Sequence, residues 1–550
     1  MSGAPPARAL LVLALVLALA WFGLLGVRPL VKADEGRYGE IPREMVASGD
    51  WLTPRLNGFR YFEKPPLQYW ATATVFRVLG PGEWGTRLWG ALAAFAALLG
   101  AAWTGARLYG PAAGFAAAAA LAGSFYFAAL SQLASLDAGV SAFLSLAVFA
   151  IVIAQLEDTP APRRRRWMLA AWAAMALAVL SKGLIGLVLP AGAVLAYALW
   201  QRNAGLLRRL HVVSGGLLFL AIAAPWFVAE SAANPEFARF FFWHEHVERF
   251  LTTEHHHAGP WWYFVPVLLL GALPWLPSLL AAPAHALRQD PPTGFRPARL
   301  LLAWCGLVFL FFSASGSKLA SYLLPIFPAL GLLIGAQLAQ ASRRFLATQA
   351  ALAALLGLAA LAWLLLGAPG AASGSVPPEF VARYRVWLIA AAASLAAAGL
   401  AAAAFARNDR APASIAALSA GGLACVLLTV VGYGTLAPIY SAYDAVERSR
   451  PSLPPAQVPF YAVRRYDHTL PFYLGRTVTM VDVSDELATA MSWEPGKAIA
   501  SVAEFARAWR EAPAACAAFA PGEYESIRTA HGLAAHEIAR SPRYVIACKP

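Results

Sequence analysis

The chain has 550 residues, of which 59% are hydrophobic and only 13% are charged. Soluble domains carry roughly 25% charged residues, so this composition could not cover the surface of a soluble protein of this length. The high apolar and aromatic content also excludes a disordered chain. Long uninterrupted apolar runs therefore predict an all-α polytopic membrane protein.

The formal net charge of +13 would suggest a nucleic-acid partner if the protein were soluble. Here the Arg residues gather in short clusters between apolar runs, which is the arrangement that sets the orientation of a membrane protein. We therefore expect no nucleic-acid partner.

About thirteen apolar runs approach the roughly 20 residues that a spanning helix needs. They begin near residues 9, 85, 111, 136, 167, 184, 210, 261, 300, 320, 345, 385 and 412. With a cytoplasmic N-terminus, every second loop is basic, at Arg107, Arg163–Arg166, Arg202–Arg209, Arg288–Arg296, Arg343–Arg344 and Arg407–Arg410. This alternation predicts that residues 28–82, residues 230–259 and the C-terminal stretch face outward, which in a bacterium means the periplasm.

The C-terminal stretch has a different pattern from the rest of the chain. Residues 458–463, 477–481 and 544–548 have the composition of strands. Residues 501–512 begin with Ser501, with Glu504 three residues later, which is typical of a capped helix. We therefore divide the chain into a transmembrane catalytic region, residues 1–436, and a small outward-facing α/β domain, residues 437–550.

Two of the four cysteines, Cys516 and Cys548, lie in this α/β region. Cys516 follows the predicted helix and Cys548 lies on the last predicted strand. Both belong to the outward side of the membrane, where disulfides persist. The sequence therefore predicts a disulfide between them.

The first outward loop is rich in residues that can do chemistry. Tyr38, Ile41 and Met45 have the i, i+3, i+7 spacing of an amphipathic helix lying at the membrane interface. Asp34 and Glu35 stand at its start, where the helix dipole stabilises carboxylates. The spacing alone therefore leaves two interpretations open, helix capping and catalysis.

Three segments of this loop resemble the first periplasmic loop of the bacterial aminoarabinose transferases, which modify lipid A. They are Asp34–Tyr38, Ser48–Trp51 and Tyr61–Leu67, the last reading Tyr-Phe-Glu-Lys-Pro-Pro-Leu. That family belongs to the protein O-mannosyltransferase-like superfamily with the GT-C fold. The resemblance implies a bundle of about 13 transmembrane helices with periplasmic amphipathic helices and a C-terminal periplasmic domain.

The resemblance also implies an activity. Members of the family are inverting enzymes that move 4-amino-4-deoxy-L-arabinose from undecaprenyl phosphate to lipid A phosphate groups at the periplasmic face of the inner membrane. The product carries less negative charge, which protects the cell from cationic peptides such as polymyxin. The residue matching Asp34 is regarded as central to catalysis.

A lipid phosphate as leaving group requires positive charge beside it. Lys64, held by the stiff Pro65-Pro66 pair, is the leading candidate, and Arg37 and Arg249 are candidates to assist it. The alternative for Lys64 is an interfacial lysine whose amine reaches the lipid headgroups.

The second outward loop combines imidazoles and carboxylates, which bind transition metals. A zinc site built from Glu63 with His244 or His246 is one interpretation, whereas a solvated polar loop is favoured for residues 255–257. The sequence does not require a cofactor.

Further candidates to line a substrate cavity are Glu35, Tyr61, Asp137, Lys182, Lys318 and Tyr322. Ionisable groups near a membrane core are usually functional. Asp137 and Lys182 lie close to the interface, however, so a structural ion pair between them is an equal alternative.

The role of Asp34 depends on the acceptor. A general base is useful for a hydroxyl acceptor, but a phosphomonoester has a second pKa of about 6 and is largely ionised at neutral pH. We therefore expect Asp34 to position the sugar, to hydrogen-bond its ammonium or hydroxyl groups, and to stabilise positive charge at the anomeric carbon.

Two other functions compete with this one. A different polyprenyl-linked GT-C transferase would move mannose or another hexose to protein or glycan. A transporter would place ionisable or helix-breaking residues near the middle of several spans, but here the chemistry gathers in the outward loops. We expect a monomer that binds the donor lipid and lipid A within the membrane.

Overall fold

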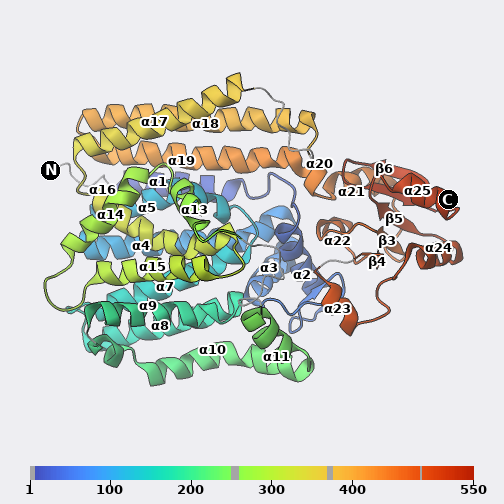
Figure 1. Ribbon diagram of the computed structural model, residues 1–550, viewed down its shortest axis with the longest axis horizontal. Helices are drawn as coiled ribbons and strands as arrows, with labels where there is room; N and C mark the ends of the chain where they lie inside the picture. Colours follow the sequence, from blue (N-terminus) through green and yellow to red (C-terminus); the bar gives the residue numbers. More distant parts are fainter. Residues whose placement is uncertain (1–6, 203, 249–258, 368–375, 484–485, 550) are drawn as a thin grey trace.

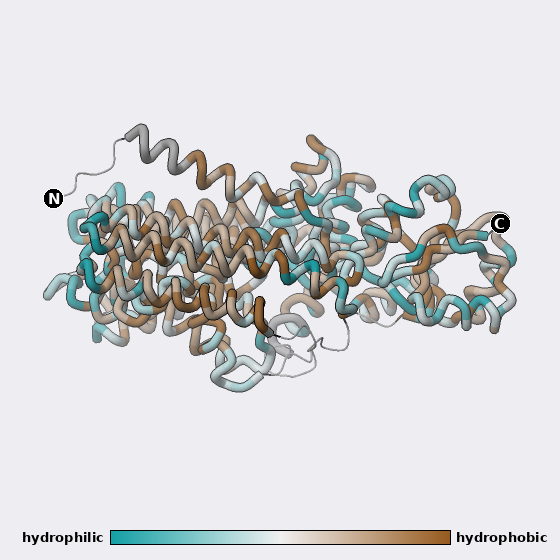
Figure 2. The backbone as a smooth tube through the Cα atoms, turned by 90° about the horizontal axis from the view of Figure 1, so that it is seen from above, coloured by the Kyte–Doolittle hydropathy of each residue, from teal (hydrophilic) through white to brown (hydrophobic). Residues whose placement is uncertain are grey.

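The computed structural model describes residues 7–202, 204–248, 259–367, 376–483 and 486–549. Long, nearly parallel helices form a bundle, and a small domain that contains a β-sheet lies at one end of it (Figure 1). Hydrophobic residues follow the long helices, whereas hydrophilic residues are more frequent at the far end of the bundle and toward the end that carries the C-terminal domain (Figure 2). The chain is a multi-pass membrane protein whose sheet-containing domain stands outside the apolar bundle.

Within the described residues, eight helices are long and apolar enough to cross a membrane. They are α4 (Glu83–Tyr109), α7 (Leu136–Gln155), α10 (Val212–Ala233), α15 (Pro297–Ala314), η3 with α16 (Ala320–Leu338), α17 (Arg343–Leu366), α18 (Pro378–Arg407) and α19 with its extension (Ala411–Tyr440).

Two bent pairs of helices raise this number to ten if each pair is one span. They are α5 (Pro111–Gly123) with α6 (Phe125–Ser131), and α13 (Phe264–Gly271) with α14 (Leu276–Gln289). The other three predicted runs are α1 (Ala7–Gly23), α8 (Ala161–Lys182) and α9 (Ile185–Gln201). A helix therefore occupies every predicted position, while thirteen membrane crossings remain a prediction.

Shorter elements collect where the bundle meets the C-terminal domain (Figure 1). They are α2 (Asp34–Ser48), β1 (Arg55–Leu56), β2 (Phe59–Arg60), α3 (Leu67–Leu79), α11 (Phe237–Arg239) and η2 (Phe240–Glu248). The remaining short turns are η1 (Gly205–Arg209), η4 (Gly434–Leu436), α20 (Ala437–Tyr440), α21 (Tyr443–Ser449) and η5 (Arg450–Ser452).

Helix α2 is more deeply buried than its sequence predicts. Tyr38, Ile41 and Met45 pack in one apolar cluster with residues of α3 and the β1–β2 hairpin, as their spacing predicts. The polar face is buried as well, because α22 of the C-terminal domain (Thr469–Leu474) covers it and Thr469 lies directly against Gly36. The helix and its apolar face are therefore as predicted, whereas the exposed polar face of an interfacial helix is not, since a domain distant in sequence covers part of it. Its position at the membrane interface stays a prediction.

The C-terminal domain contains a five-stranded sheet in the order β4-β3-β5-β7-β6. Its strands are β3 (Phe460–Val463), β4 (Thr479–Val481), β5 (Cys516–Phe519), β6 (His536–Arg540) and β7 (Val545–Cys548). β3 is parallel to β4 and β5, whereas β7 is antiparallel to β5 and β6. Its helices beyond α22 are α23 (Ala488–Trp493), α24 (Val502–Glu511) and α25 (Tyr524–Ala530).

The predicted local features of this domain are present. Ser501 caps α24 by accepting a hydrogen bond from the backbone N–H of Glu504 at 3.2 Å. Cys516 and Cys548 lie opposite one another on β5 and β7 and form a disulfide, which confirms the predicted bond. Alternate residues of the strands face two separate apolar clusters, so helices cover the sheet on both sides.

Candidate active site between the bundle and the C-terminal domain

The first residue of α2 presents a carboxylate that is open to its surroundings. The Asp34 side chain is 58% exposed, whereas the residues from Glu35 to Met45 are buried. Its Oδ1 accepts a hydrogen bond from Arg37 Nη1 at 3.1 Å. The surrounding protein displaces hydrating water and so raises the pKa of Asp34 above its ordinary value, although Arg37 opposes this rise. Asp34 is therefore held in place on one side and accessible on the other.

Three residues predicted to line the cavity meet beside Asp34. Asp137, in the first turn of α7, forms an ion pair with Lys182, in the last turn of α8. Lys182 Nζ also lies 4.9 Å from the centre of the Tyr322 ring. Both charged groups are close enough to influence the pKa of Asp34. The predicted ion pair is present, and contact of this pair with a substrate stays a prediction.

Arg37 is held by a residue that the sequence analysis missed. Its Nε donates a hydrogen bond to Glu486 Oε1 at 3.0 Å, and Nη2 pairs with the second carboxylate oxygen. His468 Nε2 lies 2.5 Å from Glu486 Oε1. Burial works against the ionised form of Glu486, but His468 and Arg37 overcome it and lower the pKa of this carboxyl to about 2. The Arg37 guanidinium is thus fixed between carboxylates from opposite ends of the chain.

The fold explains why these two C-terminal residues meet Arg37. β3 and β4 are parallel neighbours. His468 follows the carboxyl end of β3 and Glu486 follows that of β4, at the edge of a parallel sheet where ligand-binding residues gather. Charged residues just after two adjacent predicted strands were the signal that could have identified them.

Glu35 does not line a cavity, and this prediction is corrected. Its carboxylate accepts hydrogen bonds from Arg28 at 2.6 and 2.7 Å and from Arg87 at 2.8 and 3.0 Å. Burial alone would raise the pKa of Glu35, but the two guanidinium groups hold it well below its ordinary value. All three side chains are buried, so Glu35 joins the start of α2 to α4 instead of facing a substrate.

The Tyr-Phe-Glu-Lys segment forms a small polar group of its own. Tyr61 donates its hydroxyl proton to Glu63 Oε2 at 3.0 Å. Lys64 Nζ donates to the Glu63 carbonyl at 2.9 Å and lies 3.9 Å from Glu63 Oε2. The roles of Lys64 and Arg37 toward a donor phosphate stay predictions, and Arg249 lies outside the described residues.

A metal centre is not assembled by the described part of the chain, where no three His, Cys, Asp or Glu residues gather as ligands. Glu63 contacts Tyr61 and Lys64, and the ring of His244 packs at 5.0 Å from that of Phe240. The side chain of His246 lies outside the description, so the zinc site remains a prediction.

Lys318 is placed against its own loop. Its amine donates to the Ser315 carbonyl at 2.5 Å, just before η3. No described contact joins Lys318 to Asp34, so its predicted place in the cavity remains a prediction.

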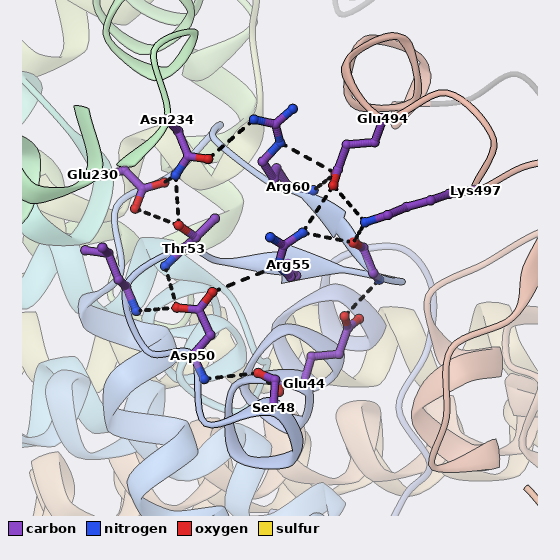
Figure 3. Close-up of polar contacts among 12 residues, drawn as sticks. Glu44, Ser48, Asp50, Thr53, Arg55, Arg60, Glu230, Asn234, Glu494 and Lys497 are labelled. Atoms are coloured by element: carbon purple, nitrogen blue, oxygen red, sulfur yellow. Dashed lines mark hydrogen bonds and ion pairs between the residues drawn. The ribbon is translucent and has the colours of Figure 1, made fainter. Parts of the chain in front are cut away.

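A second polar network fixes the β1–β2 hairpin beneath the C-terminal domain. Figure 3 shows Glu494 facing Arg55, Arg60 and Lys497. Its oxygens accept from Arg55 Nη1 at 3.3 Å, the Arg60 backbone N–H at 2.8 Å and Lys497 Nζ at 2.7 Å.

The same network continues to the end of α10. There, Glu230 accepts from the Thr53 hydroxyl at 3.1 Å and from Asn234 Nδ2 at 2.9 Å (Figure 3). The residues on both sides of α23 therefore contact the first loop, Glu486 through Arg37 and Glu494 through the hairpin.

Two family models match the chain. Residues 446–549 match the aminoarabinose transferase C-terminal domain, and residues 63–228 match the dolichyl-phosphate-mannose-protein mannosyltransferase family.

The undecaprenyl phosphate-alpha-4-amino-4-deoxy-L-arabinose arabinosyl transferase 2 of Pseudomonas fluorescens is 35% identical over 59% of this chain and 56% of its own length. The corresponding transferase of Pseudomonas aeruginosa strain LESB58 is 36% identical over 64% of this chain and 66% of its own length. The chain thus aligns with little more than half of the first of these relatives.

Solved structures extend the similarity over the whole chain. The archaeal oligosaccharyltransferase AglB of Archaeoglobus fulgidus, at 14% identity and a TM-score of 0.50 over 85% of this chain and 64% of its own, shares the fold alone. ArnT from Cupriavidus metallidurans bound to undecaprenyl phosphate is 33% identical, with a TM-score of 0.93, over 99% of this chain and 98% of its own. With that coverage and identity, the chain belongs to the aminoarabinose transferase family of GT-C glycosyltransferases.

Proposed function

We propose that the protein transfers 4-amino-4-deoxy-L-arabinose from undecaprenyl phosphate to a phosphate group of lipid A. The observation that carries this proposal is the open Asp34 carboxylate beside Arg37 and the Asp137–Lys182 ion pair. The relatives are named as transferases of this sugar, and the similar solved structure was bound to undecaprenyl phosphate.

In this reaction, the bond between the anomeric carbon and the phosphate oxygen of the donor breaks. Undecaprenyl phosphate leaves with the electron pair, and a lipid A phosphate oxygen forms the new bond from the opposite face, which inverts the configuration. The leaving phosphate gains negative charge, so cations must lie beside it. Lys64 and Arg37, with Arg249, are the residues proposed to bind it.

Asp34 has a different task. The acceptor phosphate is largely ionised at neutral pH because its second pKa is about 6, so it needs no general base. The exposed Asp34 carboxylate, fixed by Arg37, can instead hydrogen-bond the ammonium or hydroxyl groups of the sugar. Its negative charge also stabilises the positive charge that develops at the anomeric carbon.

We place the reaction at the periplasmic face of the bacterial inner membrane. The C-terminal disulfide supports this side, because disulfides persist in oxidising compartments. The charged cluster lies at the ends of α7 and α8, not at the middle of spans, which supports an enzyme over a transporter. The proposed reaction requires no cofactor. The zinc site and the monomeric state stay predictions, and no step depends on either.

Mass spectrometry of lipid A tests the proposal. Cells that express the protein together with the donor lipid should contain lipid A that is heavier by one aminopentose, and cells with Asp34→Asn should not. Unchanged lipid A, together with loss of a glycan elsewhere in cells without the protein, would instead select the hexosyl transferase. Movement of the donor lipid across liposomes without sugar transfer would select the transporter.

A further inference from the structure

Lys32 and Arg465 lie in segments that flank the start of α2, and neither forms an ion pair with a carboxylate among the residues that the structure describes. Lys32 lies two residues before Asp34, and Arg465 belongs to the C-terminal domain. Three other cations of this region are paired: Arg37 with Glu486, Lys182 with Asp137, and Arg28 with Glu35. Lys32 Nζ contacts only an aromatic face in the described residues, at 5.7 Å from the centre of the Tyr440 ring.

The fold brings the segments that carry these two residues to one junction. The Lys32 backbone N–H donates to the Tyr440 carbonyl at 2.8 Å. Arg543 Nη1 donates to the adjacent carbonyl, that of Ile439, at 3.2 Å. Arg543 also pairs with Asp467, two residues after Arg465. The first loop and the C-terminal domain therefore each contribute a cation beside the start of α2.

Among the described residues, Asp467 is the carboxylate that lies at this junction, and both of its oxygens already accept hydrogen bonds. Asp467 Oδ1 accepts from the backbone and hydroxyl of Thr469, and Oδ2 accepts from Arg543 and from the Tyr544 hydroxyl at 3.1 Å. Asp467 is buried, whereas Lys32 is exposed and Arg465 is half-buried. Asp467 thus pairs with Arg543, and it forms no described ion pair with Lys32 or Arg465.

These like charges influence one another. Partial burial lowers the pKa of Lys32, and the nearby guanidinium groups of Arg543 and Arg465 lower it further, although Asp467 opposes them. Cations held close together without an acid are unfavourable in the empty protein and favourable once an anion binds between them.

The proposed reaction involves two anions. The donor phosphate has its own candidate cations in Lys64 and Arg37. The acceptor phosphate must approach a site that already contains Asp34, Asp137 and Glu486, and it needs separate positive charge to do so.

We propose that Lys32 and Arg465 bind the phosphate group of the acceptor lipid and hold it beside Asp34. This proposal rests on the proposed function. The C-terminal domain then takes part in selecting the acceptor. A phospholipid headgroup carries the same chemical group, so the experiment has to separate the two sources.

The test uses the full-length protein in detergent, with donor lipid and lipid A. Lys32→Ala and Arg465→Ala should each raise the KM for lipid A roughly tenfold, as expected for loss of one charge-assisted hydrogen bond. Arg465→Lys should keep most of the affinity, and undecaprenyl phosphate should bind all variants as it binds the wild type. Arg464→Ala is the matched control, because Arg464 is the neighbouring arginine but pairs with Asp482.

Native mass spectrometry with lipid A and with phosphatidylglycerol separates the acceptor from ordinary lipid. Selective loss of lipid A binding supports the proposal, whereas equal loss of both lipids would make these cations general headgroup contacts and overturn it. A wild-type KM for lipid A in both alanine variants would also overturn it, while leaving the transferase function intact. If an alanine variant does not fold, Lys32→Gln and Arg465→Gln take its place. Absence of transfer by the wild type would instead contradict the proposed function itself.

Discussion

Asp34 and Glu35 are neighbours in the chain, yet they lie in opposite environments. Glu35 is buried between Arg28 and Arg87, and the two guanidinium groups neutralise it completely. Asp34 is 58% exposed and has one arginine partner, Arg37, which also pairs with Glu486. Both carboxylates belong to the first turn of α2, so helix capping alone cannot distinguish them.

The comparison shows how a structural carboxylate differs from a functional one. In the structural carboxylate, both oxygens are already paired with buried cations. A buried charge is stable only when its partners satisfy it, and such a group has no capacity left for a ligand. An accessible carboxylate that is held by one partner keeps an oxygen available. Variants of the two residues should therefore affect different properties of the protein.

The largest effect is expected for Asp34→Asn, which keeps the shape and removes the charge. Transfer should fall roughly a hundredfold to a thousandfold, as when a group that stabilises a transition state is removed. The melting temperature and the affinity for undecaprenyl phosphate should stay unchanged, as measured on the purified protein. Asp34→Glu should fail as well, because the longer side chain displaces the charge. Near-normal transfer by either variant would contradict the role given to Asp34.

The pH dependence of transfer also tests the role of Asp34. The surrounding protein displaces water and so raises the pKa of Asp34, against the effect of Arg37, so its negative charge is present above that pKa and transfer declines as the pH falls through it. Protonation of the acceptor phosphate adds a second decline near roughly pH 6. The residual activity of Asp34→Asn should therefore show only the decline near roughly pH 6, which comes from protonation of the acceptor phosphate. A residual rate that does not change with pH across that range would show that ionisation of the acceptor phosphate does not control transfer, and would contradict this account.

The next effect is on stability. Glu35→Gln leaves Arg28 and Arg87 buried without a negative partner, which should destabilise the protein by about 3 kcal/mol. The specific activity of the folded fraction should stay near that of the wild type. Glu525→Gln is the control, since its pair with Arg528 is exposed and its loss should not shift the melting curve.

The same pair of arginines predicts a pH dependence of stability. Because they hold the pKa of Glu35 below its ordinary value, Glu35 stabilises the fold above roughly pH 4.3 and loses that contribution as the pH falls further. Thermal melting in acid should therefore decline more steeply for the wild type than for Glu35→Gln. Parallel declines would show that another group controls acid stability.

A smaller effect is expected where the C-terminal domain meets the site. Glu486→Gln should lower kcat/KM roughly tenfold by releasing Arg37 from a charge-assisted pair, and Glu486→Asp should recover part of the loss. The matched variant, Glu494→Gln, weakens the contact with the hairpin instead and should lower the melting temperature more than kcat/KM. Equal loss of kcat/KM in both variants would make the two contacts equivalent.

The smallest effect on stability is expected for Lys497, the exposed residue that pairs with Glu494. Lys497→Ala removes an exposed ion pair with Glu494, and the loss of stability should be less than about 1 kcal/mol. Chemical unfolding of the purified protein measures it. A larger loss would mean that Glu494 depends on Lys497 more than on the two arginines.

Local patterns predicted much of this molecule. The apolar runs gave the position of every long helix, the strand patterns gave β3, β4 and β7, and the Ser501 cap gave the start of α24. Each of these signals lies within one short segment, where periodicity and capping act.

The parts that could not be predicted depend on contacts between distant segments. Glu35 looks like Asp34 in sequence, and only Arg28 and Arg87 make it structural. Likewise, α2 has the pattern of a surface helix, but α22 and other segments distant in sequence bury its polar face. Glu486 lies 449 positions from Arg37 in the sequence, so no pattern within a short segment could predict their contact.

The contact between Arg37 and Glu486 limits the membrane topology of the chain. Two residues that touch must lie on the same side of the membrane, so the chain crosses an even number of times between them. Among the described residues of that interval, eight helices, or ten with the two bent pairs, are long and apolar enough to cross, and α8 and α9 would bring the ten to twelve. Each of these counts is even, as required. Gain or loss of one crossing would separate Arg37 from Glu486 by the width of a bilayer. Chains that share this site can therefore change their number of crossings between these two residues only in pairs.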